Sequence, residues 1–191
     1  AVRQSLSLLI STVGLRVQTW ADPQQFLESF DRQSIGALIL DVRMPGISGL
    51  TLLDTLVEQG VDQPIILLTG HGTVDMCRRA FKAGAIEFLE KPVSDDVLLD
   101  TVQQAVRQHV HRRERLAADQ WVRERYTSLS EREREVLALI VEGLTNKEIG
   151  RALALSPRTV ETHRANLFAK LQVDNLAHLI RHYASLVSAS P

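Results

Sequence analysis

The sequence predicts a parallel α/β domain followed by an all-α domain, with a long helix between them. In the first half, short apolar runs alternate with amphipathic segments, a pattern typical of a parallel sheet covered by helices on both faces. Residues 94–126 contain neither Gly nor Pro, which favours a long uninterrupted helix. From Ser128 onward, helix N-cap signals recur at short intervals without strand-like segments between them.

The first domain is expected to begin with an amphipathic helix, because Leu6, Leu9, Ile10 and Val13 recur at helical spacing. A signal peptide is the less favoured interpretation of this segment. The pattern then predicts strands over 15–20, 36–40, 64–69 and 85–90, and helices over 24–30, 49–60 and 73–84.

The second half is predicted to be helical throughout. Ser94 followed by two Asp suits a helix N-terminus, so we expect one helix over about 95–125; two helices with a break at 109–113 are the alternative. "SERE" and "TNKE" match the capping box, and Ser156 precedes a Pro at the first helical position. The predicted helices are 131–142, 146–153, 157–171 and 175–187, of which the second and third suit a helix-turn-helix.

Composition indicates an ordinary soluble globular protein of 191 residues. The single Cys77 cannot form an internal disulfide, and no apolar run reaches the roughly 18 residues of a membrane span, so we expect a cytoplasmic protein. Charge is uneven: residues 1–108 have 9 basic and 13 acidic residues, residues 109–127 have 5 and 3, and residues 128–191 have 8 and 7. The acidic front and the mildly basic remainder suggest two tasks.

Three polar residues end the predicted strands of the first domain. Asp41, Thr69 and Lys91 each lie at or just past a strand's carboxyl end, where such sheets bind ligands. A carboxylate can attack a phosphoryl group, and a Lys ammonium and a Thr hydroxyl can bind its oxygens. A plain Lys–Asp ion pair beside a turn-bonded Thr explains the spacing about equally well.

The blocks "LILDVRMPGISG", "ILLTGHG" and "EFLEKP" resemble the signature blocks of bacterial two-component receiver domains, which have a flavodoxin-like α/β fold. The resemblance implies that Asp41 is the phosphoacceptor, Thr69 the switch hydroxyl, Lys91 the phosphate-binding lysine and Phe88 the switch aromatic. It also implies a cis Lys91–Pro92 bond and a Mg²⁺ ion held by Asp41 and the Arg43 backbone carbonyl.

One part of the receiver pattern is not found in this sequence. In the family, a first strand and an acidic pair that binds Mg²⁺ precede the first helix, whereas this sequence starts at "AVRQSL" inside that helix. Either the given sequence is a truncated form of the protein, or this receiver binds Mg²⁺ poorly. Without the strand we expect a gapped or rearranged sheet, or one completed by a neighbouring chain.

The segment "GLTNKEIG" and the later "SPRTVETHRANLFAKL" closely resemble the LuxR-type helix-turn-helix domain, and with the receiver they indicate the FixJ/NarL group of response regulators. On a helical wheel, Val160, Leu167 and Leu171 face the core, and His163 is expected to be a partly buried structural residue. The opposite arc supplies candidate base contacts: Glu161, Thr162, Ala165 and Asn166. Candidate phosphate contacts are Lys147, Arg151, Arg158, Thr159, Arg164 and Lys170. The last helix carries an apolar stripe, partly for the core and partly for a dimer seam: Leu176, Leu179, Ile180, Tyr183 and Val187.

The predicted division is a receiver over 1–108, a helical linker over 109–127 and a DNA-binding domain over 128–191. The sequence thus predicts a transcription regulator rather than an enzyme, switched by phosphorylation at Asp41, dimerising and binding a promoter. Its expected partners are a sensor histidine kinase, double-stranded DNA, a second copy and RNA polymerase, with no membrane. The alternatives are a phosphorylation-independent DNA-binding regulator with a degenerate receiver, and a small flavodoxin-like enzyme with a helical tail.

Overall fold

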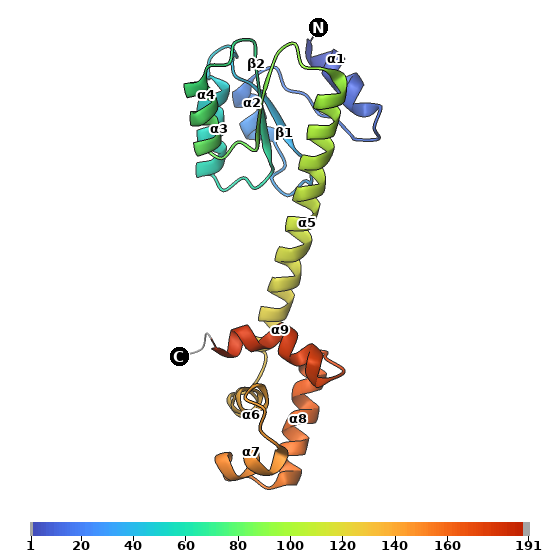
Figure 1. The fold of residues 1–191 in the computed structure, drawn as a ribbon, viewed down its shortest axis with the longest axis vertical. Helices are drawn as coiled ribbons and strands as arrows, with labels where there is room; N and C mark the ends of the chain where they lie inside the picture. The colour runs from blue at the N-terminus through green and yellow to red at the C-terminus, as the bar shows by residue number, and fades with distance from the viewer. Residues whose placement is uncertain (1, 189–191) are drawn as a thin grey trace. The chain divides into compact units, whose positions relative to one another are not determined.

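The computed structural model describes residues 2–188 and divides the chain into two compact units, residues 1–113 and 114–191. The first unit holds one parallel sheet of three strands in the order β1 (Leu38–Asp41), β2 (Ile65–Thr69) and β3 (Glu87–Glu90) (Figure 1). In the register of the sheet, Asp41 pairs with Leu68 and Thr69 pairs with Glu90. The carboxyl ends of the three strands, at Asp41, Thr69 and Glu90, therefore lie at the same end of the sheet.

The strand predicted over 15–20 is wrong. This segment has no regular secondary structure, and its apolar Leu15 and Val17 instead pack on the core beside Ile10 and Ile66. An extended segment becomes a strand only when a neighbouring backbone satisfies its N–H and C=O groups. We expected a gapped or rearranged sheet, or one completed by a neighbouring chain. The sheet has no gap within residues 2–188, because its three strands are direct neighbours.

Helices cover both faces of this sheet (Figure 1). On one face lie α1 (Val2–Ser11) and α5 (Asp95–Thr127), and on the other lie α2 (Pro23–Ser29), α3 (Gly49–Glu58) and α4 (Val74–Lys82). Strand β2 is buried throughout, because Ile65 and Leu67 face one helical layer and Ile66 and Leu68 face the other. Each such side chain contributes about 1.5–3 kcal/mol by leaving water.

Helix α5 is continuous over 33 residues, which confirms one long helix and excludes the break at 109–113. Its first half is held by apolar packing, with Leu98, Val102 and Ala105 buried against the sheet. None of the helices between residues 2 and 188 combines the length and the apolar character that crossing a lipid bilayer requires.

The second unit consists of the end of α5 and four helices, α6 (Glu131–Val141), α7 (Asn146–Leu153), α8 (Pro157–Leu171) and α9 (Leu176–Ser188). Both predicted capping boxes form, at Ser130 with Glu133 and at Thr145 with Glu148. Between α7 and α8 the chain turns at Ala154, which has a left-handed φ of 55°. The helix-turn-helix predicted here is therefore present.

Gly150 makes the tight turn between α7 and α8 sterically feasible. A Cβ atom at this position would lie 2.7 Å from the Leu155 carbonyl oxygen, and the Leu155 N–H donates to the Gly150 carbonyl at 2.8 Å. Only a residue without a side chain allows α7 to approach the turn this closely.

Candidate functional site

Asp41 and Lys91 lie side by side where the strands of the sheet end: Asp41 is the last residue of β1, and Lys91 directly follows β3. Lys91 Nζ lies 2.5 Å from Asp41 Oδ2, and both side chains are partly open to solvent. The other carboxylate oxygen, Oδ1, accepts from the Arg43 backbone N–H at 3.0 Å. The carboxylate is therefore tolerated at a strand end because a cation and a backbone donor compensate it. The Lys91–Pro92 bond is cis, as the resemblance to receiver domains implied.

Thr69 lies at the same end of the sheet, one position along from the residue that pairs with Asp41, and is fully buried. Its hydroxyl donates to the His71 carbonyl at 3.0 Å and accepts from the His71 N–H at 3.2 Å. The hydroxyl is thus held by the loop that follows β2, while the Thr69 carbonyl accepts from the Lys91 N–H at 2.7 Å.

Phe88 is half-buried on β3 and packs against the same loop. A Cβ atom on Gly72 would lie 3.1 Å from the Phe88 ring, and the Gly72 N–H donates to Glu90 at 3.0 Å. Phe88 also lines an open groove with Cys77 and Phe81 of α4. The loop after β2 therefore contacts both the Thr69 hydroxyl and the Phe88 ring.

Gly49 sets the distance between α3 and the end of β1. A Cβ atom at Gly49 would lie 2.3 Å from the Asp41 carbonyl oxygen, and the Gly49 N–H donates to the Val42 carbonyl at 3.0 Å. The backbone of Asp41 is therefore pressed directly against the first residue of a helix. Reasoning from the sequence missed this contact, although "GISGL" just after the strand was its signal.

Helix α8 presents a polar face to solvent in the second unit. Val160, Leu167 and Leu171 are buried in the core, as predicted. The four candidate base contacts are all exposed: Glu161, Thr162, Ala165 and Asn166. His163 is half-buried. A helix with small and polar side chains on its exposed face has the shape that enters a DNA major groove.

The candidate phosphate contacts differ in how they are engaged. Lys147, Arg151 and Arg158 are exposed, whereas Arg164 is half-buried near the Phe168 ring. The Thr159 hydroxyl bonds that of Ser156, the N-cap of α8. Lys170 bonds Glu133 of α6 at 2.7 Å, so its ammonium is directed at its own domain.

Helix α9 divides its apolar stripe between the core and solvent. Leu179 and Tyr183 are fully buried, and the Tyr183 hydroxyl donates to the Leu171 carbonyl at 3.1 Å. Val187 packs at the edge of the same core. Leu176 and Ile180 are 43% and 40% exposed. Of the five residues in this stripe, Leu179 and Tyr183 are therefore core residues, because their side chains anchor α9 to its own domain.

Comparison with known families agrees with both units. Residues 1–103 match the response regulator receiver domain family, and residues 127–183 match the luxR family of bacterial regulatory proteins. This chain belongs to the response regulator family. Its receiver implies a sensor kinase as partner, and its LuxR-type helix-turn-helix implies DNA binding and transcription regulation.

Individual response regulators are similar over nearly the whole chain. The transcriptional regulatory protein FixJ of Bradyrhizobium diazoefficiens is 41% identical over 181 residues, which cover 95% of this chain and 88% of that protein. The C4-dicarboxylate transport transcriptional regulatory protein DctR of Rhodobacter capsulatus is 42% identical, with coverages of 95% and 93%. The solved structure of the response regulator StyR has a TM-score of 0.89 at 38% identity, covering 96% of this chain and 93% of that one. These named relatives are regulators, and this response regulator is likewise not an enzyme.

Receiver domains generally bind Mg²⁺ for phosphorylation. Mg²⁺ requires octahedral oxygen coordination and is usually held by carboxylates together with waters. Within residues 2–188, no group of three or more His, Cys, Asp or Glu side chains is placed to hold a metal. Asp41 and the Arg43 carbonyl are the oxygens that the resemblance to receiver domains implied, and Asp41 already contacts Lys91 and the Arg43 N–H. Within residues 2–188, these two donors alone do not make up the coordination that Mg²⁺ requires.

Proposed function

We propose that this response regulator is switched by phosphorylation of Asp41, and that the phosphorylated chain pairs with a second copy and binds a promoter. The observation that carries the proposal is the contact between Asp41 and Lys91 at the edge of the sheet, at 2.5 Å. A carboxylate oxygen of Asp41 would attack the phosphorus of a phosphohistidine in the sensor kinase, forming an acyl phosphate and releasing the histidine. Lys91 would then balance the charge of the phosphoryl oxygens.

Thr69 and Phe88 are the residues that we propose respond to the phosphoryl group on Asp41. The Thr69 hydroxyl would exchange its bond to the His71 carbonyl for a bond to a phosphoryl oxygen. Because the loop after β2 contacts both side chains, a shift of this loop would change the packing of Phe88 against Gly72. This is a local charge that biases a two-state element.

Helix α8 is the proposed reading element for DNA. Glu161 would accept from a cytosine amino group, Thr162 would contact a thymine methyl, and Asn166 would pair with adenine. Ala165 leaves room for close approach. Lys147, Arg151, Arg158, Thr159 and Arg164 are the proposed phosphate contacts.

Dimerisation is proposed through the exposed part of α9. Leu176 and Ile180 lie one helical turn apart and are open to solvent. A seam built on two such residues from each copy is small, so the pair would form weakly unless a second surface contributes. Two copies would read a pseudo-palindromic site.

The test uses acetyl phosphate as the phosphoryl donor and the whole chain as acceptor. Intact mass should increase by one phosphoryl group in the parent and in Asp100→Asn, an exposed control on α5, and should stay unchanged in Asp41→Asn. Light scattering should show dimers only in samples that gain the group. Phosphorylation of Asp41→Asn, or dimers that form equally without the group, would contradict the proposal.

A second candidate function is DNA binding that does not depend on phosphorylation. The engagement of both carboxylate oxygens of Asp41 favours it, because Oδ2 contacts Lys91 and Oδ1 accepts from the Arg43 N–H. It requires that the affinity for a fluorescent duplex, selected by the protein from a randomised pool, is the same with and without acetyl phosphate. A rise in affinity that Asp41→Asn removes would eliminate this candidate.

A further inference from the structure

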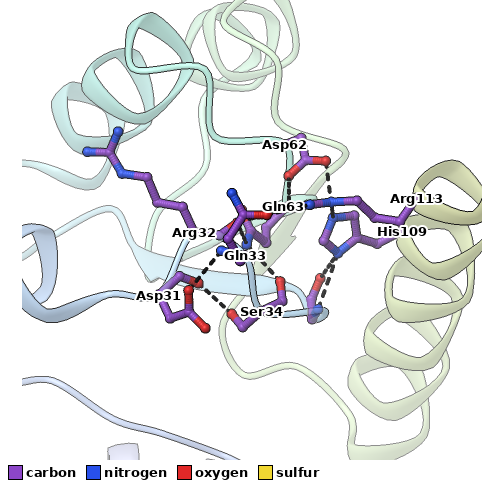
Figure 2. Close-up of polar contacts among 9 residues, drawn as sticks. Asp31, Arg32, Gln33, Ser34, Asp62, Gln63, His109 and Arg113 are labelled. Atoms are coloured by element: carbon purple, nitrogen blue, oxygen red, sulfur yellow. Dashed lines mark hydrogen bonds and ion pairs between the residues drawn. The ribbon is translucent and has the colours of Figure 1, made fainter. Parts of the chain in front are cut away.

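A second polar cluster lies in the first unit (Figure 2). Its loop residues precede β1 and β2, whereas Asp41 ends β1, so the cluster lies at the opposite end of the strands from Asp41. It joins α5 to two loops, one before β1 and one before β2. Figure 2 shows His109 and Arg113 of α5 pointing at Asp62 and at the loop 31–36. Since α5 continues to Thr127 and the first unit ends at Arg113, these contacts occupy the last turns of α5 that belong to this unit.

His109 is the buried centre of the cluster, at 1% exposure. Its Nδ1 lies 3.0 Å from the Gly36 carbonyl oxygen and 3.2 Å from the Gly36 nitrogen. Its Nε2 lies 3.4 Å from Asp62 Oδ2 and 3.3 Å from Arg113 Nε. Each ring nitrogen therefore faces one donor and one acceptor, so the imidazole is fixed on both sides.

Arg113 spans the cluster. Its guanidinium donates to Asp62 Oδ1 at 2.7 Å, to the Arg32 carbonyl at 2.9 Å and to the Gln33 side chain at 3.2 Å. Burial raises the pKa of Asp62, but Arg113 and His109 outweigh it and hold that pKa below its ordinary value. The carboxylate is therefore charged at neutral pH and bonds both α5 side chains.

The loop that receives these bonds is itself ordered by Gln63. The Gln63 amide is buried and donates to the carbonyls of Arg32 and Ser34, at 2.9 Å and 2.8 Å. Asp31 caps the same loop by accepting from the Gln33 N–H at 2.9 Å. The Arg32 carbonyl thus accepts from both Gln63 and Arg113, which links the two loops to each other and to α5.

The interactions that bind α5 to the first unit change along the helix from apolar packing to polar contacts. Leu98, Val102 and Ala105 are buried in the apolar core and Val106 packs against it, whereas in residues 107–113 the buried side chain is His109. An apolar face separates only when the core is opened, but removing one partner of a polar cluster leaves the other buried polar groups unsatisfied and so loosens the whole cluster. Local opening of such a segment does not require the rest of the domain to unfold.

We propose that Asp62, His109 and Arg113 form a lock that fixes residues 107–113 of α5 to the first unit, and that opening the lock releases this segment while residues 95–106 stay packed. The lock determines the last residue of α5 that stays bound to the receiver. It lies on the loops that lead into β1 and β2, the two strands that end in Asp41 and Thr69. A displacement of either strand would therefore reach α5 at this point.

The burial of His109 gives a direct measurement of the lock in the whole chain. Diethyl pyrocarbonate acylates accessible histidines, and His111, exposed on the same helix, serves as the internal reference. We expect Asp62→Asn and Arg113→Gln each to raise the acylation rate of His109 relative to His111 by about tenfold, the effect of losing a hydrogen bond to a charged group. Arg112→Gln, which alters an exposed arginine one position away, should leave the ratio unchanged.

Two further observations separate the lock from general destabilisation. Amide hydrogen exchange of residues 98–105 should stay at the parent rate in both variants, because these residues are held by the apolar core. The double variant should acylate no faster than the faster single variant, since either change opens the same lock. The proposal is overturned if His109 stays protected in both single variants, if residues 98–105 exchange faster in step with His109, or if the two effects multiply.

Discussion

Lys170 Nζ lies 2.7 Å from Glu133 Oε2 and so joins the end of α8 to the start of α6. Glu133 is buried at 4% exposure and also accepts from the Ser130 N–H at 2.8 Å as part of the capping box. The sequence had suggested Lys170 as a phosphate contact. Its position instead makes it a residue that orients α8 on its own domain.

Lys170→Met should therefore weaken folding more than DNA binding. The change leaves the buried Glu133 carboxylate with only its cap donors, and we expect a loss of about 1–2 kcal/mol, moderated because Lys170 is half-exposed. Arg158→Ala is the matched comparison, because Arg158 is exposed on the same helix. It should leave the thermal unfolding midpoint unchanged and reduce the salt dependence of DNA binding by about one charge. If Lys170→Met instead leaves the unfolding midpoint unchanged and reduces the salt dependence of DNA binding, Lys170 is a phosphate contact.

The same ion pair predicts a pH dependence. Burial raises the pKa of Glu133, but the bonds from Lys170 and Ser130 outweigh it and lower that pKa below its ordinary value of 4.5. A carboxyl with a lowered pKa in the folded state contributes stability that is complete above about pH 4.5 and is lost as the pH falls through the folded pKa. The difference in unfolding midpoint between the parent and Lys170→Met should thus be constant near neutral pH and shrink in acid. A difference that persists unchanged in acid would mean that packing, not charge, stabilises this contact.

The DNA-reading face of α8 predicts two classes of variant. Asn166→Ala removes a candidate adenine contact and should cost about 1–3 kcal/mol on the preferred duplex but little on a scrambled one. Lys147→Ala should weaken binding to both duplexes by the same factor, because a phosphate contact carries no sequence information. Fluorescence anisotropy on both duplexes at several salt concentrations distinguishes the classes. Equal losses on the two duplexes for Asn166→Ala would remove it from the base contacts.

Sequence patterns predicted the helices and strands that are determined by residues close to one another in the chain. The strands that end at Asp41 and Thr69 and the capping boxes at Ser130 and Thr145 formed as expected, because apolar runs and caps act within a few residues. The segment 15–20 failed because a strand also needs a partner backbone. The apposition of Asp41 and Lys91 was predictable because the ends of parallel strands share an edge.

Contacts made across long stretches of chain were not predictable. His109 meets Gly36 across 73 positions, and Lys170 meets Glu133 across 37. No periodicity or spacing in the sequence distinguishes these residues from charged or polar residues on a solvated helix face. Their partners became visible only when the layers of each unit were assembled.

The contact between Gly49 and Asp41 gives the last prediction. A methyl group on Gly49 would lie 2.3 Å from the Asp41 carbonyl oxygen, so Gly49→Ala must push α3 and the end of β1 apart. Because backbone atoms make this contact, no side chain can rotate to relieve it. We expect slower phosphorylation of Asp41 by acetyl phosphate, followed by intact mass, and a lower unfolding midpoint. Glu58→Ala is the control, since Glu58 is exposed at the other end of α3. If Gly49→Ala is phosphorylated at the parent rate, the position of Asp41 does not depend on the close approach of α3.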